Sequence, residues 1–246
     1  MKFLTAALAV LACTMVAGCG AMVLTGSGNV ETEERDVGGF DSVSLSSIGE
    51  LTIRQTGEEG LTVTADDNVL EHIVTEVRGT TLWIGLSKEC RGRIVKVQSP
   101  IRYELTVKDL SGISVSGSGT ARMESLTSGI LSVAVSGSGS VRVPGLTAET
   151  VAVAISGSGD VVVGGTTSTQ TVAISGSGEY EARELGSAAA SITVSGSGDA
   201  TVSVAETLEA YVSGSGSVGY YGDPEVDRRV SGSGEVRKLG AGTASL

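Results

Sequence analysis

The sequence predicts an all-β solenoid, a fold in which short strands stack coil upon coil around a narrow apolar core. Ser-Gly-Ser-Gly occurs seven times at intervals of 18 to 20 residues, and a fixed period near 20 is typical of repeats that are too small to fold alone. Val or Ile precedes every tetrad, and period-two alternation puts it on one strand face with the apolar residue two positions earlier in most repeats. The tetrads begin at Ser116, Ser136, Ser156, Ser175, Ser195, Ser213 and Ser231.

Each repeat continues after its tetrad with a second short strand and a polar return. Apolar residues stand two and four positions after the tetrads, as in Val141 and Val143. Glycine reaches the conformations that a sharp corner needs, and small residues let corners stack at about 4.8 Å. We expect the serine hydroxyls to bond to nearby backbone groups or to the serine one coil away. A flexible Gly/Ser linker is excluded, because the tetrads are in register with apolar columns.

Residues 29–108 form a less regular section, and residues 109–239 form the regular coils. Apolar runs predict strands over 40–45, 51–54, 61–64, 73–77 and 82–86, and Asp66-Asp67-Asn68 predicts one helical turn or tight loop between them. Nothing between the sections looks like a linker, so we expect one domain over 29–239 and a tail at 240–246. Tyr220 and Tyr221 are suited to covering the last coil, with a carbohydrate-stacking site as the alternative.

The first residues have the features of a bacterial lipoprotein signal. A basic second residue, an apolar run over 4–16 and small residues before Cys19 describe a secretory segment too short to span a membrane. Val16-Ala17-Gly18-Cys19 resembles the lipobox, which predicts removal of residues 1–18 and lipidation of Cys19. An ordinary signal with a chance cysteine is the alternative. Gly20 in place of aspartate favours the outer membrane, and residues 19–28 are the expected lipidated tether.

The charge balance excludes whole classes of partner. The chain has a formal net charge of −11, with 17 basic and 28 acidic residues. Such a balance argues against nucleic acid, which needs clustered Lys and Arg, and against electrostatic binding to anionic lipid. Membrane attachment is therefore expected through the N-terminal lipid, and stable anchoring takes more than one acyl chain.

One ordinary thiol remains once the expected signal is removed and Cys19 is acylated. Cys13 is lost with the signal, which leaves Cys90 without a partner for an internal disulfide. A nucleophilic Cys90 is conceivable because basic neighbours lower a thiol pKa, but His72 is the only histidine available as a base, and we favour an incidental cysteine. The basic neighbours are Lys88, Arg91 and Arg93.

A search for catalytic or cofactor motifs yields no catalytic, cofactor or metal residue. Residues 214–219 match the dinucleotide pattern G-x-G-x-x-G, but no helix follows, so the match comes from the repeat itself. One histidine cannot supply a two-histidine metal site. Acidic residues follow four tetrads, and we interpret them as a solvated stripe; calcium binding and a carboxylate pair of a β-helical carbohydrate enzyme are the alternatives. These residues are Asp160, Glu179, Asp199 and Glu235.

Several short strings, taken in order, resemble a known family. They are Phe40-Asp41-Ser42-Val43, residues 61–70 (LTVTADDNVL), residues 79–84 (GTTLWI), the repeated Val-Ser-Gly-Ser-Gly and Tyr221-Gly222-Asp223-Pro224. The chain resembles the head GIN domain, or "putative auto-transporter adhesin", family of bacterial envelope proteins over about residues 29–239. The resemblance implies a single-stranded right-handed β-helix, often behind a lipoprotein signal, and brings no catalytic residues.

Together these observations predict a non-enzymatic, lipid-anchored envelope protein whose β-helix acts as an adhesin-like or scaffolding binding module. The expected partner is an envelope protein or a glycan, and we expect no cofactor. Two alternatives stay open: a β-helical carbohydrate-active enzyme, and a structural protein that forms homo-oligomers end to end. The expected location is the cell envelope, with the rod on the periplasmic or the cell-surface face of the outer membrane.

Overall fold

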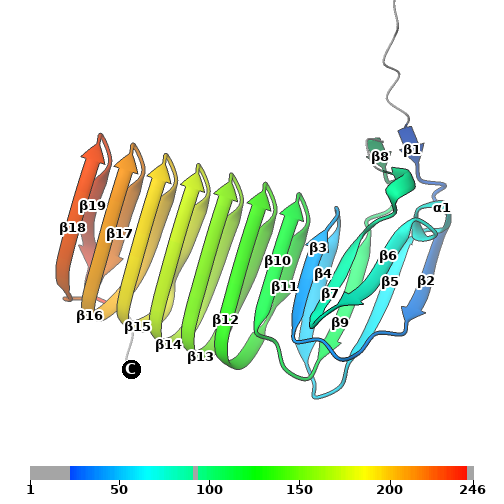
Figure 1. Ribbon diagram of the computed structural model, residues 1–246, viewed down its shortest axis with the longest axis horizontal. Coiled ribbons are helices and arrows are strands. Elements are labelled where there is room, and N and C mark those ends of the chain that lie inside the picture. Colours follow the sequence, from blue (N-terminus) through cyan, green and yellow to red (C-terminus); the bar gives the residue numbers. More distant parts are fainter. Residues whose placement is uncertain (1–22, 91–93, 243–246) are drawn as a thin grey trace, which may run out of the picture.

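The computed structural model describes residues 23–90 and 94–242, so the expected signal segment (1–18) and Cys19 lie outside the described residues. The chain forms a β-solenoid of about six turns, which confirms the predicted fold class. Figure 1 shows a row of stacked coils that ends, on the N-terminal side, in a less regular group of strands. Within the described residues, no helix is long and apolar enough to cross a membrane.

The regular coils are built from parallel strands that follow one another in chain order. In each coil, one strand ends at a tetrad, the chain turns, and the next strand runs back along the other side (Figure 1). Neighbouring coils pair tetrad on tetrad, with Ser136 and Gly137 opposite Ser116 and Gly117. The strands are β10 (Gly112–Gly117), β11 (Thr120–Met123), β12 (Ser125–Gly137), β13 (Ser140–Gly157), β14 (Asp160–Gly176), β15 (Glu179–Gly196), β16 (Asp199–Gly214), β17 (Ser217–Tyr221), β18 (Glu225–Gly232) and β19 (Glu235–Gly240).

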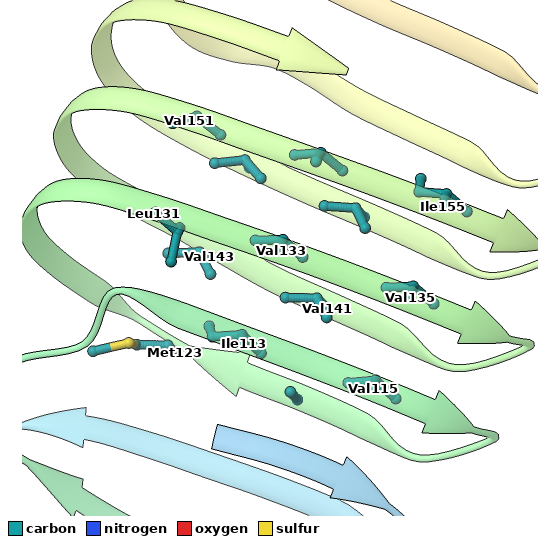
Figure 2. Close-up of a cluster of buried hydrophobic side chains, with 14 of the residues drawn as sticks. Ile113, Val115, Met123, Leu131, Val133, Val135, Val141, Val143, Val151 and Ile155 are labelled. Atoms are coloured by element: carbon teal, nitrogen blue, oxygen red, sulfur yellow. The ribbon is translucent and has the colours of Figure 1, made fainter. Parts of the chain in front are cut away.

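The core lies between the two sides of the flattened coil. Figure 2 shows Val133 and Val135 on one side facing Val141 and Val143 on the other, and all four are at most 1% exposed. Each inward column continues from coil to coil, so the valines and isoleucines contact one another along the axis as well as across it. Small aliphatic side chains suit this narrow space, which is why the repeats contain so few aromatic residues.

Each tetrad needs both of its glycines, for different reasons. The first takes a φ that side chains rarely adopt, +115° at Gly137, and a Cβ there would stand 2.7 Å from the Gly117 carbonyl oxygen one coil away. The second has no such φ, but a Cβ on Gly139 would stand 2.5 Å from Val115 Cγ1. Stacking at strand spacing therefore excludes side chains at both positions.

The expected bonding of the tetrad serine hydroxyls is not found. Among the described residues, no hydroxyl of the seven tetrads forms a hydrogen bond; the second serine uses its backbone N–H instead. Ser138 N–H donates to the Gly117 carbonyl at 2.9 Å, and Ser158 N–H to Gly137 at 2.9 Å. The corner is thus held by main-chain bonds, and serine is used there because it is small.

The less regular section contains the predicted strands and some that the sequence did not indicate. The expected helical turn is α1 (Asp67–Leu70), and all five predicted strands are present, within a few residues of their expected limits. β2 and β9 were missed, together with the short pair β1 and β8. The strands are β1 (Val23–Thr25), β2 (Val30–Arg35), β3 (Ser42–Ser46), β4 (Glu50–Gln55), β5 (Gly60–Asp66), β6 (Ile73–Arg78), β7 (Thr81–Leu86), β8 (Ile94–Lys96) and β9 (Arg102–Val107); a 3-10 turn covers Lys88–Cys90.

Both sections share one core, but their order in the stack is not the order of the chain. β3 and β4 form a coil of their own that pairs with β10 and β11 in the register of the later repeats, with Val43 opposite Ile113 and Leu51 opposite Ala121. On its other side the same coil pairs with β7 and β9. The intervening chain folds into strands that close the end of the core, where β6, β5 and β2 are antiparallel to their neighbours.

At the distal end of the stack, Arg228 and not the two tyrosines lies over the last coil. A further coil, β18 and β19, lies beyond Tyr220 and Tyr221, so the expected aromatic cap is wrong. Arg228 occupies the inward column that carries Ala210 one coil earlier. Its Nη1 donates to the Val236 carbonyl at 3.0 Å and so bridges the two last strands across the end of the core.

A buried polar network interrupts the apolar core in the middle of the regular coils. Gln170 stands in the inward column between Val151 and Ala190 and is 1% exposed. Its amide donates to Ser187 Oγ at 2.7 Å and accepts from Tyr180 Oη at 3.0 Å, while Ser187 Oγ donates to a backbone carbonyl. Burial raises the pKa of the Tyr180 phenol, which therefore stays a hydrogen-bond donor at physiological pH.

Candidate binding faces of the solenoid

The side of the coil that precedes the tetrads presents an uncharged surface, which we call the neutral face. In the last six residues before each tetrad of β12 to β15, the three outward positions carry uncharged residues, which form three columns that register from coil to coil. All of them are exposed or half-buried. The neutral face consists of Ile130, Ser132, Ala134, Thr150, Ala152, Ala154, Thr169, Thr171, Ala173, Ala189, Ser191 and Thr193.

The column that contains Ala154 reaches an aromatic residue on each side of the neutral face. On the proximal side this residue is Trp83, which stands beyond Ser114 of β10 and Ser44 of β3. The Trp83 ring centre lies 4.2 Å from the Arg78 guanidinium carbon. At the distal end it is Tyr211, which follows Thr193 and precedes Arg229. The Arg229 guanidinium carbon lies 5.3 Å from the Tyr211 ring centre, within range for a cation–π contact.

A shallow groove runs along the distal end of the neutral face. It has a volume of about 220 Å³ and lies between an outward row of Thr193, Tyr211 and Arg229 and a row of tetrad serines on the same three coils. On the three coils before Thr193 the position of Tyr211 is taken by alanine, whose side chain is too short to form a groove beside the serines. The groove therefore exists because the last coils depart from the small-residue pattern.

The opposite side of the coil, after the tetrads, is charged. The four acidic residues predicted to form a stripe do share one column, in which Asp160, Glu179 and Asp199 stand on consecutive coils. They are exposed, and Asp199 Oδ1 accepts from the Ser217 backbone N–H at 3.0 Å. Within the described residues, no cluster of three or more acidic, histidine or cysteine side chains is arranged to hold a metal ion. A solvated stripe accounts for the column.

Within the described part of the chain, the other residues that the sequence raised as candidates form no hydrogen bond or ion pair with one another, and Arg91 and Arg93 lie outside that part. Cys90 is 4% exposed and unpaired, in keeping with a structural cysteine. His72 lies near the exposed Glu71 and Glu89, at 3.8 and 4.0 Å. Tyr221 is covered on one side, since the Arg183 guanidinium carbon lies 4.8 Å from its ring centre. The ring at the end of the neutral face is Tyr211, which no sequence pattern singled out.

A set of hydrogen bonds, which we call the N-terminal clasp, ties residues 25–29 to the less regular section. Asn68 Nδ2 donates to the Thr25 carbonyl at 2.8 Å, and Gln98 Nε2 donates to the Gly26 carbonyl at 2.7 Å. Ser27 donates through its hydroxyl to the Asp67 carboxylate. The structured chain therefore includes residues 23–28, which the sequence assigned to a tether.

Asp66 is the buried centre of the clasp. Its Oδ2 accepts from the backbone N–H groups of Gln98 and Ser99, at 2.9 and 3.3 Å, and the residue is 0% exposed. Burial alone would raise the pKa of this carboxyl, but the donors around the carboxylate outweigh burial, so the Asp66 pKa lies below its ordinary value. The pKa of Asp67 is lowered as well, first by the Ser27 hydroxyl and then by Asn29.

With this geometry described, the class of protein is a single-stranded β-solenoid that presents one neutral and one charged face. The chain belongs to the family described as "putative auto-transporter adhesin, head GIN domain", whose model matches residues 39–224. No curated protein matches the chain.

Several solved structures have the same fold. A "putative adhesin" from Bacteroides fragilis is 26% identical, with a TM-score of 0.81, over 88% of this chain and 100% of that one. A "putative lipid binding protein" from Parabacteroides distasonis is 24% identical, with a TM-score of 0.75, over 88% and 99%. A "putative adhesin" from Parabacteroides merdae is 20% identical, with a TM-score of 0.70, over 89% and 100%. The family match ends before β18 and β19, the strands that close the distal end of this chain.

Proposed function

We propose that this protein is a lipid-anchored, non-enzymatic envelope module that binds a neutral glycan along its neutral face. The observation that carries the proposal is the absence of charge from twelve registered outward positions on four coils. The chain as a whole has a net charge of −11, so charge is kept on other surfaces. A partner that covers the neutral face would bury no ion, and burying an unpaired ion is costly.

A glycan suits this surface better than a protein does. The cores of protein interfaces are enriched in aromatic residues, Met and Arg, which supply most of the binding energy. The neutral face has none of these between Trp83 and Tyr211. It offers both hydroxyl groups and methyl groups, which match the hydroxyl and C–H groups of sugar rings. Tyr211 adds a ring against which a sugar can stack at the distal groove.

The adhesin description of the family supports a binding role and an envelope or surface location. Lipidation of Cys19 and attachment to the outer membrane are the finer parts of the proposal, and they depend on the lipobox-like residues 16–19. The non-enzymatic assignment is supported by the acidic column, whose carboxylates are exposed on the charged face.

The test compares two variants of the same coil. Ala173→Lys places a charge on the neutral face, and Val162→Lys places the same charge on the opposite face of β14, between Arg142 and Glu181. Multivalent beads coated with residues 19–246 are incubated with isolated envelopes and with a panel of purified neutral polysaccharides. We expect Ala173→Lys to weaken glycan binding at least about tenfold, which corresponds to about 1.4 kcal/mol, and Val162→Lys to bind normally.

Enzymatic treatment of the envelopes distinguishes a glycan from a protein partner. The proposal requires that binding survive protease treatment and be lost after glycosidase treatment. The reverse pattern would identify a protein partner and overturn the glycan assignment. Equal loss of binding in Ala173→Lys and Val162→Lys would remove the neutral face as the site.

A further inference from the structure

The strands nearest to the expected lipid form a separate two-stranded sheet whose outer side is apolar at its first pair of residues and polar at its last, where Thr25 and Lys96 are exposed. β1 and β8 pair in parallel, with Val23 opposite Ile94, and do not join the 17-stranded sheet. The middle pair, Leu24 and Val95, packs against the core. The outer pair does not: Val23 is 47% exposed and Ile94 is 50% exposed. A water-facing strand would normally alternate apolar-in with polar-out.

The composition of this pair of strands differs from that of the rest of the chain. Its six residues, Val-Leu-Thr and Ile-Val-Lys, contain one cation and no acid, although the chain has a net charge of −11. Phospholipid head groups repel clustered acids and tolerate lysine, whose stem can lie along the apolar boundary.

The chain leaves little distance between β1 and the lipid site. Three residues separate Cys19 from Val23, so their Cα atoms are at most about 14 Å apart when the link is fully extended. An acylated Cys19 would sit at the boundary of acyl chains and head groups, and that interfacial zone is itself several ångströms deep. Val23 and its partner Ile94 would therefore lie beside or within the interface.

The N-terminal clasp makes this position matter for the whole rod. Beyond Thr25 the chain is held by Asn68 and Gln98 and by a bond from Gly26 N–H to the Lys96 carbonyl at 2.8 Å. No loose linker separates β1 from the described part of the less regular section. Any surface that β1 and β8 contact therefore also fixes the orientation of the solenoid relative to that surface.

We propose that Val23 and Ile94 dock onto the bilayer that carries the acylated Cys19, so that the β1–β8 sheet orients the rod relative to the membrane. The inference rests on the lipid anchor of the proposed function and adds a second, non-covalent membrane contact. Two apolar side chains give too little hold to bind a membrane alone. The contact acts only because the anchor keeps it at the surface.

The experiment supplies the anchor chemically, so that it does not depend on processing in the cell. Residues 19–246, which contain the entire described fold, are prepared with Cys90→Ser and Trp83→Phe, and Cys19 is coupled to a maleimide lipid in phosphatidylethanolamine–phosphatidylglycerol vesicles. Ile94→Trp then reports on the docking site. Ile130→Trp is the matched control, because Ile130 is 58% exposed on the neutral face, away from β1.

We expect a blue shift of the tryptophan emission from position 94 on coupling and its quenching by brominated lipids, with neither effect at position 130. Adding Val23→Asp should abolish both effects while the circular dichroism spectrum stays unchanged. Coupled protein whose tryptophan at position 94 behaves as it does in water would overturn the docking proposal without touching lipidation. Mass spectrometry of the native protein decides lipidation separately, since an unmodified Cys19 would refute the anchor alone.

Discussion

The regular coils and the less regular section solve the same problem, closing a core, by different physical means. In the coils, stability comes from repetition: each tetrad rests on the tetrad before it, and main-chain bonds join them. In the less regular section, antiparallel strands and side-chain bonds to Asp66, Asp67 and Asn68 hold unrelated segments together. The coils should therefore be sensitive to any added volume at a corner, and the less regular section to the loss of particular polar groups.

The largest expected effect comes from adding one methyl group at a stacked corner. A Cβ on Gly176 would lie 2.4 Å from the Gly157 carbonyl oxygen, and the φ of +125° is one that side chains rarely adopt. We expect Gly176→Ala to lower the free energy of unfolding by more than about 3 kcal/mol, because strain and backbone overlap act together. Urea unfolding followed by far-ultraviolet circular dichroism measures the change.

Two other glycines sharpen this comparison. Gly79, between β6 and β7, has a φ of +64° but nothing within 4 Å of the position that a Cβ would take, so Gly79→Ala should cost only about 1–2 kcal/mol. Gly129 has open space and no such φ, and Gly129→Ala should be nearly neutral. Equal losses in all three variants would show that stacking does not explain the tetrads.

The second prediction concerns the polar network inside the coils. Tyr180→Phe removes the donor to Gln170 Oε1, which is then buried without a partner, and should cost about 1–3 kcal/mol. Combining it with Gln170→Leu should cost less than the sum of the two single variants, because the double variant leaves fewer unpaired groups. A double-mutant cycle in urea measures the coupling. Strict additivity would mean that the two side chains do not stabilise each other.

The third prediction separates the clasp from the coils by pH. The pKa values of Asp66 and Asp67 are lowered in the folded protein, so their ionised forms contribute stability above the unfolded pKa, near 4, and this contribution is lost as the pH falls through the folded pKa. NMR signals of Gly26 and Ser27 should shift or broaden in that acidic range before those of Gly137 and Gly157. In Asp66→Asn the clasp signals should already be displaced at neutral pH. Simultaneous loss of both sets of signals in the wild type would contradict an independently titrating clasp.

The contrast between the two sections also explains what the sequence could predict. In a repeated unit the same pattern occurs many times. The period, the strand faces and the corners could therefore all be predicted from Val133, Val135 and Ser136 and their equivalents. In the less regular section each contact occurs only once, so no repetition in the sequence indicates it. β2 has almost no apolar residues, since it is a charged edge strand, and the stacking of β3 on β10 joins positions about 70 residues apart, which no local pattern indicates.

The candidate binding face could be predicted from the sequence only in part. The outward columns of Ala, Ser and Thr are visible in the repeats, but the inward columns and the acids after the tetrads form the more conspicuous patterns. Tyr211 is one aromatic residue without a repeat or an aromatic neighbour in the sequence, so no pattern indicated it, whereas Tyr220 and Tyr221 are adjacent. Gln170 breaks an inward column in plain view; that break is the signal from which the buried network could have been found.

The smallest expected effect on stability tests how the coils end. Arg228 holds an inward position on the last coil and donates to the Val236 carbonyl, so the open end of the core presents charge to any approaching edge. Charged side chains of this kind discourage strand edges from pairing with another copy. Arg228→Leu should change the free energy of unfolding by about 0.5 kcal/mol or less, yet it should promote concentration-dependent self-association that sedimentation velocity detects. Arg237→Leu, on an outward column of the same coil, is the matched control. A monomeric Arg228→Leu variant at high concentration would show that the short last strands keep the end from pairing without the charge.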